Sequence, residues 1–145
     1  MIDTKLAPYG IFLLRMSLGV MFVAHALLKY LVFTMPGFEA FLGKVGFPAF
    51  FAWPIVLAEL IGGLAIMAGF YGRWISAVLL PVLLGAFAVH WPNGWLFNVP
   101  NGGWEYPAFL AVAALTHILA GEGAFALRPA RLPLLSSPAI TPQTA

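Results

Sequence analysis

The sequence contains no cysteine among its 145 residues. This absence excludes thiol catalysis, disulfide exchange and thiolate-bound zinc or iron–sulfur clusters. Charge is also scarce, because Asp, Glu, Lys and Arg together make up 8% of the chain and form no basic cluster. A basic patch is the mark of a nucleic-acid-binding protein, so no nucleic-acid partner is implied. The sequence also lacks a nucleophile triad, a phosphate-binding loop and a metal-ligand motif, and it therefore does not predict an enzyme that acts alone.

Hydrophobic residues are correspondingly abundant, at 62% of the chain, with a mean hydropathy of +0.96. These values exclude an ordinary soluble protein and make lipid the solvent. Four apolar runs predict membrane-spanning helices over residues 9–30, 52–70, 74–91 and 105–121. The first run gives about 33 Å of helix, enough to cross the hydrocarbon layer. We therefore predict an all-α fold, a polytopic membrane four-helix bundle in a single domain over residues 1–125.

Two segments outside these runs have a different character. Residues 31–51 are interrupted by prolines and glycines too often to span, but Thr34 is placed to cap a short helix with Phe38 and Phe41 on one side. We expect this helix to lie in the membrane interface, between the first and second spans. Residues 126–145 are rich in Pro, Ser and Thr, which predicts a disordered cytoplasmic tail.

The first predicted span carries polar residues along one stripe. Arg15, Leu18, Phe22, His25 and Lys29 recur at intervals of three and four, so this stripe should face protein or water. Lys29 can snorkel to the interface from its helix end. Arg15 can snorkel to the N-terminal side or pair with a neighbouring helix. His25 can be a core histidine bonded to one carbonyl or a functional one.

Glu59 is the most informative residue of the second span. It lies about 10 Å below the start of that helix, where an unpaired carboxylate costs several kcal/mol. We place His25 at a similar depth, so His25 and Glu59 are predicted to form a proton-exchanging pair. Gly62 and Gly63 follow one turn later and would let another helix approach closely. His117 in the fourth span is expected to be a packed histidine.

Residues 90–106, HWPNGWLFNVPNGGWEY, combine turn signals, polar groups and interfacial aromatics. The triplet PNG occurs twice, eight residues apart, and predicts a folded loop. Tryptophans prefer the level of the lipid headgroups, so this loop should lie where two spans leave the membrane. Together with the end of the first span it supplies the predicted ligand-binding residues: Lys29, His90, Trp91, Asn101, Trp104, Glu105 and Tyr106.

The same loop ends in PNGGWEY, and this motif resembles the DoxX family of small bacterial membrane proteins. Further segments that resemble this family are LLR at residues 13–15, AHALLK at 24–29, PGFEAFLGKVGFP at 36–48 and AELIGG at 58–63. The resemblance runs in order from Leu13 to Gly121. It implies a component of the bacterial inner membrane that is linked to oxidoreductase or quinone-dependent systems, including the role of a membrane subunit of an oxidoreductase.

The charge distribution predicts the orientation. An even number of spans puts both termini on one side, which carries Lys5, Arg73, Arg128 and Arg131 against Lys29 and Lys44 on the other. The positive-inside rule then places both termini in the cytoplasm and residues 90–106 in the periplasm.

Three functions fit the predicted polar cluster. The first is binding of a quinone or quinol, with Trp91, Trp104 and Tyr106 walling the ring and His or Glu exchanging protons. The second is a haem bundle with His25 and His90 as axial ligands, disfavoured because His90 lies nearer its helix end. The third is a non-catalytic scaffold or small-solute carrier. The expected partners are the lipid bilayer and a redox subunit, no metal is expected, and self-association stays open.

Overall fold

The computed structural model describes residues 3–127 and is all-α. Its helices are α1 (Ala7–Leu27), α2 (Met35–Lys44), α3 (Ala52–Ala68), α4 (Gly72–His90) and α5 (Glu105–Ala120). A π-helical turn, η1 (Leu28–Val32), extends α1, and short 3-10 turns η2 (Ala49–Phe51) and η3 (Trp91–Asn93) precede α3 and follow α4. The all-α prediction is confirmed, and so is the short helix between the first two long helices.

Three helices are long and apolar enough to cross a membrane. They cover Ala7–Val32, Ala49–Ala68 and Gly72–Asn93, with 26, 20 and 22 residues. α5 is apolar but has only 16 residues, or about 24 Å of helix against about 30 Å of hydrocarbon. Of the four predicted spans, three therefore have full length and the fourth is shorter.

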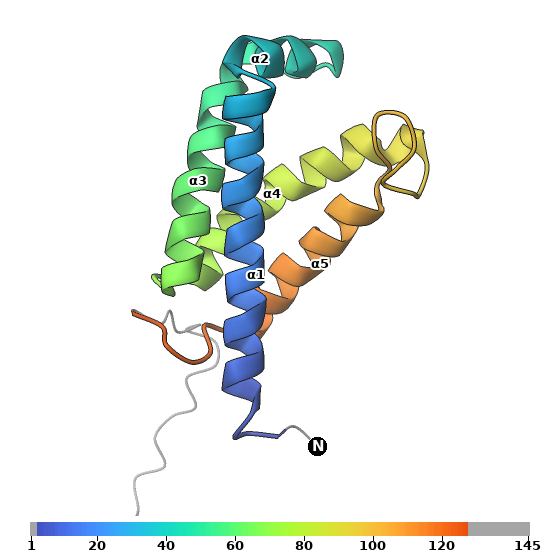
Figure 1. Ribbon diagram of the computed structural model, residues 1–145. Helices are drawn as coiled ribbons and strands as arrows, with labels where there is room; N and C mark the ends of the chain where they lie inside the picture. Colours follow the sequence, from blue (N-terminus) through green and yellow to red (C-terminus); the bar gives the residue numbers. More distant parts are fainter. Residues whose placement is uncertain (1–2, 128–145) are drawn as a thin grey trace, which may run out of the picture.

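The long helices form two hairpins that diverge (Figure 1). α1 packs along α3, and α4 packs along α5. The hairpins meet near the start of α1, the α3–α4 turn and residues 121–127, which we call the closed end. They separate toward α2 and residues 91–104, which we call the open end, and there α2 lies across the ends of α1 and α3. Both ends of the described chain are at the closed end.

Small residues allow the close approach of α1 and α3. A Cβ added to Gly63 would lie 2.8 Å from the carbonyl oxygen of Gly19, so the two backbones touch where these glycines cross. Gly62 makes room for a side chain of α4, since its added Cβ would lie 2.8 Å from the side chain of Leu79. The predicted role of Gly62 and Gly63 is therefore confirmed. One buried cluster surrounds this crossing: Leu18, Phe22, Ile66, Leu79, Leu83, Leu110 and Ala114.

α2 begins where the sequence predicts a cap. Thr34 adopts φ 60° and its hydroxyl accepts a hydrogen bond from the N–H of Gly37 at 3.4 Å. The helix buries Met35, Phe38 and Leu42 against Ala26, Ala52 and Val56, which fastens it to the ends of α1 and α3. The apolar side of this amphipathic helix thus packs on the ends of α1 and α3, and its amphipathic character is that of a helix in a membrane interface.

Residues 121–127 continue from α5 beneath the helices (Figure 1). Ala124 donates a backbone hydrogen bond to Pro8 at 2.9 Å, and Leu127 donates one to Ala68 at 3.2 Å. Positions 126 and 127, predicted as the start of the tail, thus belong to this segment. The remainder of the predicted tail, residues 128–145, lies outside the described residues.

The glycine crossing yields the first prediction. We expect Gly63→Ala to lower the melting temperature in detergent, because its methyl group must push the α1 backbone away from α3. Gly10→Ala on α1 is the matched control, since no atom lies within 4 Å of its added Cβ. Equal melting temperatures for the two variants would contradict this packing.

Candidate ligand cavity and a second polar cluster

A cavity of about 810 Å³ lies between the two hairpins at the open end, with contributions from all five helices. Its size is within the range of small-molecule sites, about 300–1,000 Å³. Most of its wall is apolar. The polar lining consists of six residues that the sequence singled out: His25, Lys29, Glu59, His90, Asn101 and Tyr106.

Lys29 and Glu59 form an ion pair in the wall of the cavity. Lys29 donates to both carboxylate oxygens of Glu59, at 2.8 and 2.6 Å, and Glu59 is only 4% exposed. The π-helical turn η1 carries Lys29, whose ammonium also lies 5.6 Å from the ring centre of Phe38. Glu59 is therefore paired, which is one of the three states that its depth allows.

His25 and Glu59, the predicted pair, each form a hydrogen bond with another group. The Nδ1–H of His25 donates to the carbonyl of Met21, one turn back, at 2.7 Å. This leaves the long, flexible side chain of Lys29 to reach the carboxylate. His25 and Glu59 nevertheless line the same cavity.

His25 and Tyr106 join the two hairpins across the cavity. Their rings stack with centroids 5.4 Å apart and planes inclined by 21°. Because Nδ1 of His25 donates to a carbonyl, Nε2 is the acceptor of the neutral ring. The hydroxyl of Tyr106 is buried and makes no hydrogen bond within residues 3–127. A buried hydroxyl without a partner costs free energy, so this position favours a ligand that can accept or donate a hydrogen bond.

His90 and Asn101 belong to the folded loop as well as to the cavity. Nδ1 of His90 lies 3.0 Å from the carbonyl oxygen of Gly102, and the amide of Asn93 donates to that oxygen at 2.8 Å. Asn93 also donates to the carbonyl of Asn101 at 3.2 Å. The two PNG turns are thus tied to each other, which holds His90 and Asn101 at the cavity rim.

The remaining predicted ligand-binding residues lie outside this cavity. Trp91 and Trp104 pack on each other with centroids 4.9 Å apart. Glu105 accepts a hydrogen bond from the N–H of Phe97 at 2.9 Å and lines a smaller cavity of about 350 Å³, which shares Tyr106. These indoles brace the loop and do not line the larger cavity, so a contact of Trp91 and Trp104 with a ligand ring stays a prediction.

Phenylalanines supply the aromatic wall instead. Most come from residues 33–51, which the sequence marked as an interfacial helix and not as cavity lining. The aromatic set of the cavity is Phe22, Phe33, Phe38, Phe41, Phe47 and Phe51. Their density in this short connector was the signal that could have identified them. Within the described chain no three His, Asp or Glu residues come together as a metal site.

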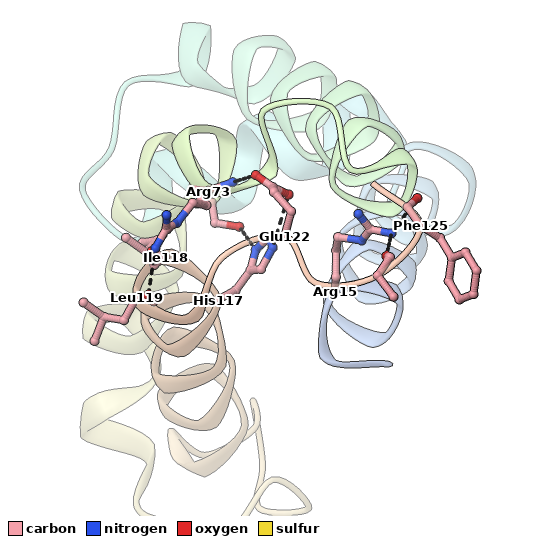
Figure 2. A network of polar contacts seen from close by, with 9 residues as sticks. Arg15, Arg73, His117, Ile118, Leu119, Glu122 and Phe125 are labelled. Carbon is pink, nitrogen blue, oxygen red and sulfur yellow. Dashed lines mark hydrogen bonds and ion pairs between the residues drawn. The ribbon is translucent and has the colours of Figure 1, made fainter. Parts of the chain in front are cut away.

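A second polar cluster lies at the closed end, where residues 121–127 meet the helices (Figure 2). Arg15 is fully buried and donates to the carbonyls of Ala124 and Phe125 at 3.2 and 3.3 Å. Its pairing is therefore with the segment after α5, and not with a neighbouring helix or the headgroups. Gly69, at φ +67°, makes room for the guanidinium, which would collide with any Cβ there.

Arg73 caps the C-terminus of α5. Its guanidinium donates to the carbonyls of Ile118 at 2.8 Å and Leu119 at 2.7 Å, groups that have no partner within the helix. Its backbone N–H donates to Glu122 at 2.9 Å. In the sequence, Arg73 was only a signal of topology, and no pattern marked Glu122.

His117 is packed, as expected, but it has polar neighbours from distant parts of the chain. Its Nδ1 lies 2.8 Å from the hydroxyl of Ser76 on α4, and its Nε2 lies 3.7 Å from Glu122. Figure 2 shows this imidazole between α4 and the segment that follows α5. Separations of 41 residues from Ser76 and five from Glu122 gave no local motif from which to predict the cluster.

The fold and the cavity define the class first: an all-α membrane protein with an apolar ligand-sized cavity and few polar groups at its rim. The DoxX family model matches residues 10–91, more than half of the chain, and the protein belongs to this family. It is 36% identical over 77 residues, 53% of this chain, to "Putative oxidoreductase CatD" of Bacillus subtilis (strain 168). That match spans 56% of the relative's length. No solved structure matches the chain significantly.

The ion pair yields the second prediction. Glu59→Leu and Lys29→Met each leave one charge without its partner, so each should lower the free energy of unfolding by about 3–5 kcal/mol. The double variant removes both charges and should recover most of that loss. Urea or thermal unfolding of the four proteins in one detergent measures the coupling. Additive losses in the double variant would contradict the pairing.

Proposed function

We propose that the open-end cavity binds the ring of a quinone or quinol and that the protein is a membrane component of a redox system. The observation that carries this proposal is the buried, unpartnered hydroxyl of Tyr106 beside His25, in an otherwise phenylalanine-rich cavity. A quinone is flat and largely apolar, with two carbonyl oxygens. It therefore needs aromatic surfaces and one or two donors, and this cavity offers both.

The polar residues have complementary roles in this proposal. Tyr106 donates to one quinone oxygen, and Nε2 of His25 exchanges the proton that accompanies electron transfer. Lys29 pairs with Glu59, and this ion pair lines the same cavity as the imidazole of His25. His90 and Asn101 at the rim connect these groups to bulk water. Electrons come from a partner subunit, in agreement with the oxidoreductase name of the Bacillus subtilis relative.

We further propose that the protein lies in the bacterial inner membrane with the closed end in the cytoplasm. Lys5, Arg15 and Arg73 are at the closed end, and Lys29 and Lys44 are at the open end. The positive-inside rule supports this orientation. One of these cations, Arg73, also donates hydrogen bonds to the last carbonyls of α5. The cavity then opens toward the periplasm.

The third prediction tests the ligand. A series of short-chain quinones should raise the melting temperature of the purified protein. Tyr106→Phe should remove most of this shift, because it deletes the one hydroxyl that the ligand would satisfy. Tyr30→Phe is the matched control, since Tyr30 is 51% exposed and lies outside the cavity.

Other outcomes would redirect the proposal. A Soret absorption that disappears in both His25→Ala and His90→Ala would indicate haem, since both histidines line the cavity. If no quinone changes the melting temperature and Tyr106→Phe melts like the wild type, the scaffold or solute-carrier function is favoured.

The fourth prediction tests the orientation. Single cysteines can be placed without interference because the chain has none. Asn98→Cys and Gly43→Cys at the open end should react with a membrane-impermeant maleimide in intact cells, whereas Thr4→Cys at the closed end should react only after lysis. The opposite pattern would reverse the orientation.

A further inference from the structure

His117 is the histidine that the cavity does not use. The chain has three histidines, and His25 and His90 line the open-end cavity. His117 lies at the closed end with no exposed surface. Imidazole is of interest because it is the side chain whose unperturbed form changes charge near neutral pH, and this one faces a carboxylate.

The two ring nitrogens of His117 are in different situations. Nδ1 shares a hydrogen bond of 2.8 Å with the hydroxyl of Ser76, and that hydroxyl can either donate or accept. Nε2 is buried and makes no hydrogen bond within residues 3–127. It faces the Oε2 atom of Glu122 at 3.7 Å, which is longer than a hydrogen bond but close enough for an ion pair.

The charges around this imidazole come from three directions. Arg73 on α4 and Arg15 on α1 are buried cations, each bound to backbone carbonyls. Glu122 brings a buried carboxylate from the segment after α5. α3 adds no charge at this end, because its one ionisable residue, Glu59, lines the open-end cavity.

Glu122 is also the point at which residues 121–127 fasten to the helices. One carboxylate oxygen accepts the backbone N–H of Arg73 at 2.9 Å, and the other faces His117. Gly72 makes this approach feasible, since an added Cβ there would lie 2.6 Å from Glu122 and 3.0 Å from His117. The segment is otherwise held by backbone hydrogen bonds to Pro8 and Ala68 and by Arg15.

We propose that His117 and Glu122 form a proton-operated latch that fastens residues 121–127 across the closed end of the bundle. When the imidazole takes up a proton, Nδ1–H donates to the Ser76 oxygen. The positively charged ring then presents Nε2–H to the carboxylate of Glu122. Among residues 3–127, only the closed segment offers the imidazolium a carboxylate, so proton binding and closure favour each other. Acidification tightens the segment, and alkaline pH loosens it and gives water access to Arg15.

This latch is independent of the ligand proposed for the cavity. It uses a different histidine at the opposite end of the protein, with the apolar cluster around Ile66 and Leu79 between the two sites. A negative result for quinone binding would therefore not contradict the latch, and a negative result for the latch would not contradict quinone binding in the cavity.

Hydrogen–deuterium exchange of the full chain in detergent tests the latch. After correction for the intrinsic effect of pH, the amides of Ala124 and Leu127 should exchange on the order of tenfold more slowly at pH about 5.5 than at pH about 8. His117→Gln should abolish this pH dependence while keeping a polar partner for Ser76. His90→Gln is the matched control and should retain it.

Glu122→Gln provides a second variant in case His117→Gln does not fold. It keeps an acceptor for the N–H of Arg73 but removes the negative charge, so the pH dependence should again disappear. Two results would overturn the proposal: wild-type exchange that does not depend on pH after correction, or a pH dependence that persists unchanged in whichever of the two variants folds.

Discussion

The demand that every buried backbone group find a partner inside the protein governs this structure. Lipid offers no hydrogen bonds, so irregular backbone at membrane depth must be satisfied by the protein itself. α5 stops after 16 residues, and the chain continues beneath the bundle without helical structure. Arg73 donates hydrogen bonds to the last carbonyls of α5, and Arg15 donates to the carbonyls of Ala124 and Phe125. The two buried arginines thus make a short fourth helix tolerable.

The same demand explains the contrast between the two ends of the bundle. At the closed end, the side chains of Arg15 and Arg73 bond to backbone carbonyls. At the open end, six polar residues line the cavity, and the hydroxyl of one of them, Tyr106, is left without a partner in the described chain. Buried polar atoms without partners are rare in native structures, and they also occur at the closed end, on Arg15 and His117. The open end differs in having a ligand-sized cavity beside such an atom, which makes it the place to expect a ligand.

Much of the fold could be predicted from the sequence because hydrophobicity and turn chemistry are local properties. The apolar runs, the Thr34 cap and the glycines of α3 each depend on neighbouring residues. The polar stripe on α1 was also readable, since its spacing follows the helical period. The partners of the residues on that stripe could not be predicted in this way. Lys29 was expected to snorkel, yet the π-turn η1 directs it to Glu59, and no local pattern announces a π-turn.

The candidate site was predicted in part for the same reason. His25, Lys29, Glu59, His90, Asn101 and Tyr106 were identified by their residue type in apolar surroundings, and the structure gathers them. Trp91 and Trp104 were predicted to wall a ligand ring but do not line the larger cavity, because aromatic character alone does not tell which side of a loop faces a cavity. Glu122 and Ser76 were missed because their relation to His117 is created only when α4, α5 and residues 121–127 come together.

The divergence of the hairpins gives the protein the outline of a wedge (Figure 1). A wedge occupies more area in the leaflet that holds its broad end than in the other. The lateral pressure of that leaflet therefore pushes the hairpins together and acts directly against the volume of the cavity. Lipids whose headgroups crowd this leaflet should shrink the cavity, and lipids that relieve crowding should let it widen, so that bilayer composition becomes a variable of the binding site itself.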